Sequence, residues 1–468
     1  MSRKNKRIVL ILFFCLAARL AFFGFFHPWT PEKESGVVLQ KDALGYHNLA
    51  LTMIEHHRFA FSAGDEPNSV RTPLYPVFVA GLYLVFGAKP WLVLLVQILM
   101  DTLTCFLLFT ALSRLFTTRT GLAAALFYAF DPFLVLYPST LLSDMLFVFL
   151  LVLSLFFFSL ARASVQTNRT AAFYGLSGFS VGLATLARPI SQYIPIIFVA
   201  FLLIVYREKL KEALKYSLAA AGLFLLAVAP WFIRNYAVFG RWALSSSGSH
   251  NLLIEYVVPM EVQKRNQHFK TVQHSLLDEA EKNMIADHRE PETMDSFAKA
   301  SYYRDLAVAY IVRNPERFLR SYVLGVFHTF THLDTTTFAE KLGFELQTVD
   351  IKAYTDIKDL IKAFIAKKGT SGLIAAGLIL PYLVVSYLGL ALGLVVSWKR
   401  LDRTALLWCL LMAGYFIAVT GVAGTARFKI PSIPFYLAFT GTGIAWFLGK
   451  IRRKKASPEN FEKEQKKG

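Results

Sequence analysis

Cysteine is scarce in this chain of 468 residues, which has three: Cys15, Cys105 and Cys409. Each lies within an apolar run, so no disulfide framework is implied. The sequence also lacks the paired histidine or cysteine spacing of a zinc site, and no glycine-rich phosphate loop follows a predicted strand. These absences exclude a disulfide-stapled domain and a nucleotide-binding fold of the usual kind. We therefore predict no cofactor and no residues dedicated to a metal.

Long apolar runs, by contrast, are abundant: 55% of the residues are hydrophobic, and the mean hydropathy is +0.45. A bilayer core about 30 Å thick needs about 20 apolar residues per helix. The sequence predicts an all-α polytopic integral membrane protein with ten transmembrane helices, at 8–26, 90–112, 121–138, 145–162, 172–187, 190–206, 216–233, 372–397, 404–423 and 432–449. The first run is too long for a removed signal peptide and lacks a small-residue cleavage site, so we interpret it as a signal anchor.

The formal net charge of +18 would suggest nucleic acid if the basic residues lay together on a soluble domain. They lie instead in five short segments between apolar runs or at the ends of the chain, at 2–7, 113–119, 206–215, 398–403 and 450–455. Basic loops stay on the cytoplasmic side, and the ten predicted helices place all five there, with both termini inside. The charge therefore reflects topology, and no nucleic-acid partner is expected.

This topology divides the chain into four parts. They are a transmembrane module at 1–233 with an outer loop at 27–89, an extracytoplasmic segment at 234–371, transmembrane helices at 372–449, and a basic cytoplasmic tail at 450–468. The polar stretch at 260–317 predicts a small helical region outside the membrane. Two apolar stretches, 73–87 and 318–332, either span the membrane or lie in its interface. Because a spanning 73–87 would move the basic loop at 113–119 outside, we favour interfacial helices.

Six charged residues, far apart in the sequence, reach the outer boundary of this predicted bundle: Asp42, Arg71, Asp144, Arg188, Arg234 and Arg427. Each one alone could be a headgroup anchor or a helix cap. As a set they are harder to explain in that way, because short outer turns carry few basic residues. We predict that they form a functional site.

Two further acids, Asp101 and Asp131, lie inside predicted spans, where ionisable residues are often functional. Asp131 precedes Pro132, so a kink with a local hydrogen bond is the simpler interpretation of that carboxylate.

Several motifs resemble those of C-type glycosyltransferases, most closely the bacterial branch that contains protein O-mannosyltransferases and the lipid A aminoarabinose transferase. They are DALGY at 42–46, RTPLYP at 71–76, LLSD at 141–144, LARP at 186–189, PWFIRNYAVFGR at 230–241, SSSGSHNLL at 245–253 and ARFKIPSIPF at 426–435. The resemblance runs from about residue 40 to about residue 440, and the order and spacing of the motifs carry it.

The resemblance assigns roles to individual residues. It implies that Asp42, four residues before Tyr46, is the catalytic carboxylate, and that Arg71 binds the lipid phosphate, with Tyr75 in the same segment. It implies a second functional acid at Asp144, which either binds the acceptor or orients the first loop. The substrate-binding residues that we predict are Tyr46, Arg71, Tyr75, Arg188, Arg234, His250, Asn251 and Arg427. Glu255 departs from the family pattern, in which glycine or asparagine is common.

The predicted function is transfer of a sugar from a polyprenyl-phosphate donor to an acceptor hydroxyl outside the membrane, with inversion. A carboxylate suits the base, and arginines suit the phosphate leaving group. The acceptor is a protein, a glycan or a lipid, and the expected location is the bacterial inner membrane. Some relatives use a divalent ion, which Asp42 and Asp144 could hold, but we predict metal independence. The alternative is a transporter or flippase of lipid-linked sugars, although no internal repeat is visible to support it.

Overall fold

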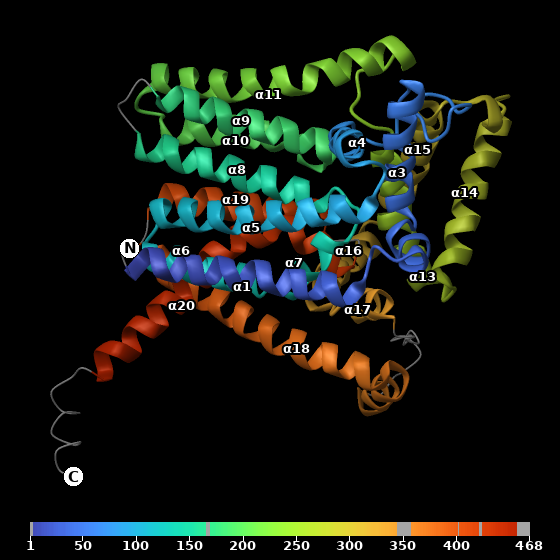
Figure 1. Ribbon diagram of the computed structural model, residues 1–468. Helices are drawn as coiled ribbons and strands as arrows, with labels where there is room; N and C mark the ends of the chain where they lie inside the picture. Colours follow the sequence, from blue (N-terminus) through green and yellow to red (C-terminus); the bar gives the residue numbers. More distant parts are fainter. Residues whose placement is uncertain (1–2, 165–168, 344–356, 401, 421–423, 456–468) are drawn as a thin grey trace.

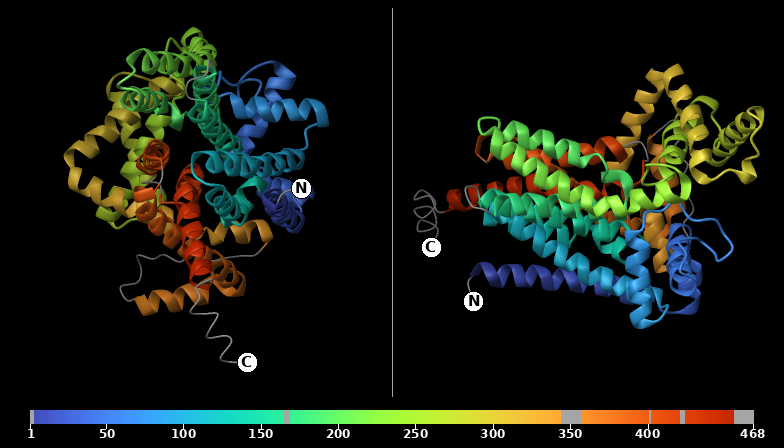
Figure 2. Two further views of the ribbon diagram at one scale, coloured as in Figure 1. Left: turned by 90° about the vertical axis from the view of Figure 1, so that its left-hand side faces the viewer. Right: turned by 90° about the horizontal axis from the view of Figure 1, so that it is seen from above.

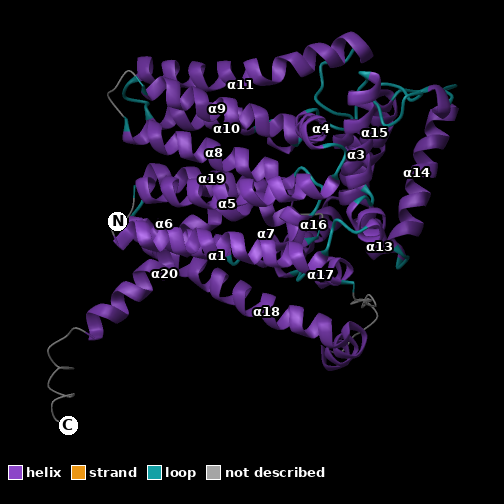
Figure 3. Ribbon diagram, viewed as in Figure 1, coloured by secondary structure: helices purple, strands orange, loops and turns teal. Residues whose placement is uncertain are grey.

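Helices and the loops between them make up all of the chain that the computed structural model describes, which is residues 3–164, 169–343, 357–400, 402–420 and 424–455 (Figure 3). The predicted all-α fold is therefore confirmed. Parts of the predicted regions fall outside the described residues, including 344–356 in the predicted extracytoplasmic segment, 421–423 in the predicted span at 404–423, and the tail beyond residue 455.

One group of helices forms a bundle in which they run side by side (Figure 1). They are α1 (Arg3–Phe26), α5 (Pro90–Leu115), α6 (Thr118–Ala129), α8 (Asp144–Ala163), α9 (Thr170–Ala187), α10 (Ile194–Val205), α11 (Leu210–Phe239), α18 (Ile357–Arg400), α19 (Arg403–Thr420) and α20 (Ile433–Lys455). The first residues of α1 and the last of α20 lie at the same end of the bundle (Figure 2). This shared end agrees with the predicted placement of both termini on one side.

A second group of helices gathers at the other end of the bundle (Figure 1). They are α3 (Asp42–His56), α4 (Leu74–Phe86), α12 (Ser247–Asn251), α13 (Val258–Arg265), α14 (Phe269–Ala286), α15 (Ser296–Arg313), α16 (Pro315–Thr331) and α17 (Thr335–Leu342). Part of this layer has a hydrophobic core of its own, which includes Leu253, Val257, Leu276 and Met284. The segment that the sequence predicted to be helical outside the membrane is thus a packed helical layer.

Seven of the described helices are long and apolar enough to cross a membrane, or eight if α6 and the bent continuation after it count as one span. Within the described residues the ten predicted ranges fall mainly on helices, but α10 has only 12 residues, and α20 is not among the seven helices long and apolar enough to cross a membrane. Helix α4 has 13 residues, too short for a 30 Å hydrocarbon core at about 1.5 Å per residue. Its length favours the interfacial position predicted for 73–87.

A sharp bend interrupts the third apolar segment, where α6 and the following α7 (Pro132–Leu136) meet at 57°. Asp131 caps α7: its Oδ1 accepts hydrogen bonds from the backbone N–H of Phe133 at 2.9 Å and of Leu134 at 3.2 Å. The predicted local hydrogen bond at this acid is therefore confirmed. The bend directs the chain through η2 (Tyr137–Ser139), a short 3-10 helix, toward Asp144.

The second intramembrane acid, Asp101, has a structural partner. The buried guanidinium of Arg19 on α1 pairs with its carboxylate, and the Tyr128 hydroxyl donates to Asp101 Oδ1 at 2.5 Å. Arg19 also donates to the carbonyl oxygen of Ala129 at 2.9 Å. Breaking a buried, hydrogen-bonded pair of this kind by removing one partner is costly. We interpret this ion pair as a structural contact that holds α1, α5 and α6 together.

Close helix contacts depend on glycine where α18 crosses α20. A Cβ on Gly393 would lie 1.8 Å from the carbonyl oxygen of Phe439. Small residues let membrane helices approach this closely. We expect Gly393→Ala to lower the free energy of unfolding by about 1–3 kcal/mol because the helices must separate. Gly377→Ala on the same helix has open space at its Cβ and serves as the control. Equal thermal midpoints for the two variants in detergent would contradict this contact.

Candidate active site

The first loop carries Asp42, the first residue of α3, to the end of the bundle where α12 to α17 gather. Lys41, directly before it, has a φ of 52°, in the left-handed region that is unfavourable for a residue with a side chain. Strain of this kind persists where the surrounding structure fixes a functional side chain. The Asp42 side chain is 39% exposed, so its carboxylate is accessible from solvent.

Two carboxylates and three arginines form a continuous chain of ion pairs, which we call the outer cluster: Arg71, Asp42, Arg427, Asp144 and Arg188. Arg71 Nη2 lies 2.6 Å from Asp42 Oδ1. Arg427 joins the two acids, with Nη1 at 3.3 Å from Asp42 Oδ2 and Nη2 at 2.9 Å from Asp144 Oδ2. Arg188 pairs with the other oxygen of Asp144, which is only 2% exposed. Residues up to 385 positions apart thus meet in one site.

Aromatic side chains hold the first loop against the bundle below the outer cluster. The Arg71 guanidinium lies over the ring of Tyr46, 4.9 Å from its centroid, as expected for a cation–π contact. Tyr46 packs edge-on against Tyr75 at 4.8 Å, and its hydroxyl is 3.2 Å from Ser143 Oγ. The two predicted tyrosines therefore position Arg71 and Asp42 relative to the residue before Asp144.

A buried glutamine connects this aromatic pair to the η2 turn. The Tyr75 hydroxyl donates to Gln97 Oε1 at 2.7 Å. Gln97 Nε2 in turn donates to the carbonyl oxygens of Pro138 at 3.0 Å and Thr140 at 2.9 Å. Fully satisfied buried amides of this kind fix backbone position. Gln97 was not predicted as a site residue because it interrupts an apolar run without any recognisable motif.

Besides Tyr46 and Tyr75, three predicted substrate-binding residues lie outside the outer cluster: Arg234, His250 and Asn251. Arg234 donates to the carbonyl oxygen of Asn68 at 3.0 Å, and Asn68 Oδ1 accepts from the backbone N–H of Arg71 at 2.8 Å. Arg234 therefore supports the segment that carries Arg71. His250 and Asn251 are exposed on α12, and His250 packs against Tyr303 instead, at 5.7 Å between ring centroids.

The charges of the outer cluster shift the pKa of its exposed acid. Burial alone would raise the pKa of Asp42, but Arg71 and Arg427 outweigh it and lower the pKa to about 2. Glu255 on the neighbouring η4 (Leu252–Val257) is close enough to interact electrostatically with Arg427 and Asp42, and burial raises the pKa of its carboxyl. Glu255 is thus a third acid beside the cluster, one to which the sequence assigned no role.

Among the residues that the structure describes, no group of three or more His, Cys, Asp or Glu side chains could hold a metal ion. Arg427 lies between Asp42 and Asp144, the two acids considered as ligands. Metal independence stays a prediction.

Two side chains of the α17 region form hydrogen bonds with the η2 turn, and the sequence did not predict these contacts. Asp334, at the start of α17, accepts a hydrogen bond from the Tyr137 hydroxyl at 2.7 Å. Lys341, near its end, donates to the carbonyl oxygen of Ser139 at 2.7 Å and lies 4.3 Å from the ring centroid of Phe26. Because this turn leads directly to Asp144, we interpret the two contacts as positioning contacts.

Lys341 is 3% exposed, and its burial lowers its pKa to about 7. An unfolded lysine has a pKa near 10.4, so between about pH 7 and 10 the unfolded chain binds a proton that the folded chain lacks. Stability should therefore rise with pH in this window, by up to about 1.4 kcal/mol per pH unit. We expect Lys341→Met to remove this rise between pH 7 and 9 in thermal unfolding. The exposed Lys270→Met is the control, and equal pH slopes in the two variants would contradict the buried amine.

The fold and the outer cluster together define a polytopic membrane protein with a carboxylate–arginine site at one end of its bundle. Residues 66–233 match the family model described as dolichyl-phosphate-mannose-protein mannosyltransferase. This match includes Arg71, Asp144 and Arg188. No curated protein matches the chain.

Two solved structures from Archaeoglobus fulgidus share this fold. The Archaeoglobus fulgidus oligosaccharyltransferase tethered with an acceptor peptide is similar over 97% of this chain and 50% of its own, with 14% identity and a TM-score of 0.54. AglB from Archaeoglobus fulgidus, in complex with an inhibitory peptide and a dolichol-phosphate, is similar over 94% and 51%, with 14% identity and a TM-score of 0.50. ArnT from Cupriavidus metallidurans bound to undecaprenyl phosphate is similar over 93% and 77%, with 13% identity and a TM-score of 0.43.

The chain spans about half the length of the oligosaccharyltransferase chains that it matches. Over that length the chain has the fold of these oligosaccharyltransferase structures, and the family match at 66–233 agrees with the resemblance predicted from the motifs.

Proposed function

We propose that this protein is a membrane glycosyltransferase that moves a sugar from a polyprenyl-phosphate donor to an acceptor hydroxyl, with inversion at the anomeric carbon. The observation that carries the proposal is the outer cluster, in which an accessible carboxylate, Asp42, is held between two arginines. A carboxylate beside fixed cations is the pairing that this reaction requires: a base for the acceptor and a charge partner for the leaving phosphate.

The proposed reaction assigns a task to each side of the cluster. Asp42 accepts the proton of the acceptor hydroxyl while that oxygen forms a bond to the anomeric carbon. The bond between the anomeric carbon and the phosphate oxygen breaks, and its electron pair stays on the lipid phosphate. Arginines stabilise the growing negative charge through hydrogen bonds to the phosphate oxygens.

Arg71 has a donor free for such a phosphate. Its Nη2 is engaged by Asp42, but its Nε is buried and has no hydrogen-bond partner among the described residues. A buried donor without a partner is costly, and a bound oxyanion would satisfy it. A phosphate there would also compete with Asp42 for Arg71, which would raise the Asp42 pKa from about 2 toward a value better suited to a base.

Similar proteins support the class of donor and leave the acceptor open. The AglB structure contains a dolichol-phosphate, and the matching family is described by transfer from dolichyl-phosphate-mannose to protein. We propose a lipid-phosphate donor for this chain on the same grounds, with a protein, glycan or lipid acceptor. The flippase alternative is not favoured, because the exposed acid and its arginines lie at one end of the bundle rather than at mid-depth.

The proposed orientation places the outer cluster outside the cytoplasm, in a bacterial inner membrane. The basic segments at 113–119, 206–215 and 398–403 join helices at the opposite end of the bundle, so the positive-inside rule assigns that end to the cytoplasm. A lipid donor explains why Asp42 lies so close to a membrane surface.

The test of the proposed function is mass spectrometry of polyprenyl-phosphate sugars and envelope glycans from cells with and without this protein. We expect one lipid-linked sugar to accumulate, and one envelope component to lose that sugar, when the protein is absent. Unchanged profiles of both pools would contradict the proposal.

A further inference from the structure

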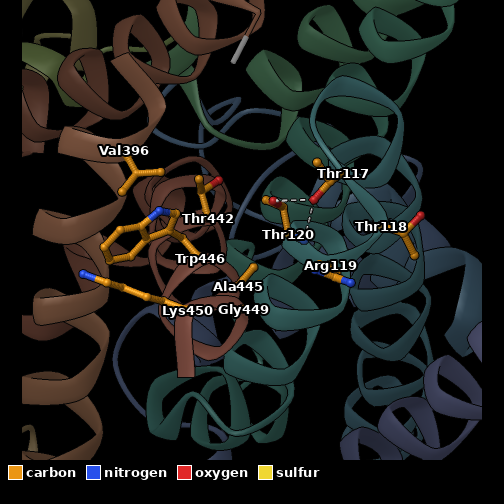
Figure 4. A pocket seen from close by; sticks show the side chains of 10 residues that line it. All are labelled: Thr117, Thr118, Arg119, Thr120, Val396, Thr442, Ala445, Trp446, Gly449 and Lys450. Atoms are coloured by element: carbon orange, nitrogen blue, oxygen red, sulfur yellow. Dashed lines mark hydrogen bonds between the residues drawn. The ribbon is translucent and has the colours of Figure 1, made fainter. Parts of the chain in front are cut away.

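A cavity of about 650 Å³ lies at the end of the bundle opposite the outer cluster. It is an open pocket lined by the first turn of α6 and the adjoining ends of α18 and α20 (Figure 4). The outer cluster is formed instead by the first loop, the start of α8 and the segment before α20. The cavity is therefore separate from the proposed active site.

Two cations line this cavity without an acidic partner. Arg119 comes from α6 and Lys450 from α20, and none of the residues that line the cavity is Asp or Glu. Neither cation forms an ion pair with any residue in the described part of the chain. Arg119 extends toward α20, since its Nη1 lies 3.9 Å from where a Cβ on Gly449 would be. Lys450 Nζ lies 5.2 Å from the ring centroid of Trp446. Two positive charges from different helices thus border one cavity.

The N-terminus of α6, which borders this cavity, does not itself provide an open anion site. Thr117 already accepts a hydrogen bond from the backbone N–H of Thr120 at 3.1 Å, so the first turn of α6 is capped within the protein. The two side-chain cations remain without such a partner.

Part of the wall of the cavity is apolar, and this part continues onto an exposed apolar surface. Val396, Ala445 and Trp446 line the cavity. Beside them on the same helices, Val395 is 65% exposed and Leu448 is 50% exposed. Tryptophan and basic residues are common where a helix crosses from hydrocarbon to headgroups. The cytoplasmic leaflet, to which this end is assigned, is the one that carries anionic lipid.

We propose that this cavity binds the headgroup phosphate of an anionic phospholipid of the cytoplasmic leaflet, with Arg119 and Lys450 as its charge partners. The acyl chains lie along the exposed apolar faces of α18 and α20. Free phosphate would gain nothing from these apolar walls. The lipid would join α6, which leads to Asp144 through the bend at Asp131, to α20, which follows Arg427. The proposal does not depend on the reaction at the outer end.

The test is native mass spectrometry of the whole protein, purified in detergent and titrated with phosphatidylglycerol or phosphatidylcholine. Neutralising two phosphate contacts with Arg119→Gln and Lys450→Gln should weaken phosphatidylglycerol binding roughly thirtyfold. The matched control, Arg207→Gln with Lys211→Gln, removes two exposed cations from the same end and should bind as the wild type does. The charge-keeping pair Arg119→Lys and Lys450→Arg should retain most of the binding, which separates lost charge from lost folding.

Three results would overturn the proposal. Equal weakening in the cavity variant and the control variant would show attraction to surface charge alone. Phosphatidylcholine binding as tightly as phosphatidylglycerol would remove the role of net lipid charge. Displacement of the lipid by millimolar inorganic phosphate would show a site for the free ion rather than for a lipid.

Discussion

Asp42→Asn is expected to insert, fold and bind the lipid donor, yet to transfer sugar at least about a hundredfold more slowly, because loss of a positioned base typically costs about 10²–10⁴ in rate. Asparagine keeps the size of the side chain and one hydrogen-bond acceptor toward the arginines, but it cannot accept a proton at neutral pH. The measurement is sugar transferred per folded protein, with donor affinity determined on the same sample.

The competing account of Asp42 is a helix cap at the start of α3, which asparagine would replace at almost no cost. In the structure both carboxylate oxygens accept hydrogen bonds from arginines, contacts that a helix cap does not require. Near-normal transfer by the asparagine variant would exclude Asp42 as the base. The search would then move to Asp144 and to Glu255, which lies close enough to interact with Asp42.

Arg71→Ala is expected to lose nearly all transfer, whereas Arg71→Lys should keep part of it. Lysine restores the charge but not the planar fork that can contact Asp42 and a phosphate oxygen together. Removal of one fixed donor to a developing oxyanion typically costs about 10²–10³ in turnover. Turnover and donor affinity should be measured separately, because a phosphate ligand affects both.

The control for Arg71 is Arg289→Ala, which removes an exposed arginine after α14 and leaves the outer cluster unchanged. It should transfer sugar as the wild type does. If Arg71→Ala retained both the donor affinity and the turnover of the wild type, Arg71 would not be the phosphate ligand.

The sequence predicted which residues reach the outer boundary, but not how they pair. Asp144 and Arg427 lie at the predicted ends of apolar runs and Asp42 lies in the predicted outer loop, so hydropathy places all three on one side of the membrane. That Arg427 bridges the two acids depends on how helices pack around them, and hydropathy carries no such information. The same holds for Arg234: the sequence predicted its depth in the membrane, but it did not predict its hydrogen bond to Asn68.

The sequence did not predict the contacts made by α17. Lys341 lies in a short, polar stretch whose composition predicts an exposed surface, and lysine is almost never fully buried. Its partner Ser139 is 202 residues away, so no local signal connects them. Hydropathy also could not distinguish full-length spans from shorter apolar helices such as α10, which has 12 residues.

The most direct test of the central claim uses the purified protein in detergent, where transport across a membrane cannot occur. A pool of polyprenyl-phosphate sugars and an envelope acceptor fraction are added, and mass spectrometry follows both. A glycosyltransferase should release free polyprenyl phosphate in equal amount to the glycosylated acceptor, and the Asp42→Asn protein should release almost none. Donor that is bound by the wild type but remains intact with every acceptor fraction would contradict the claim.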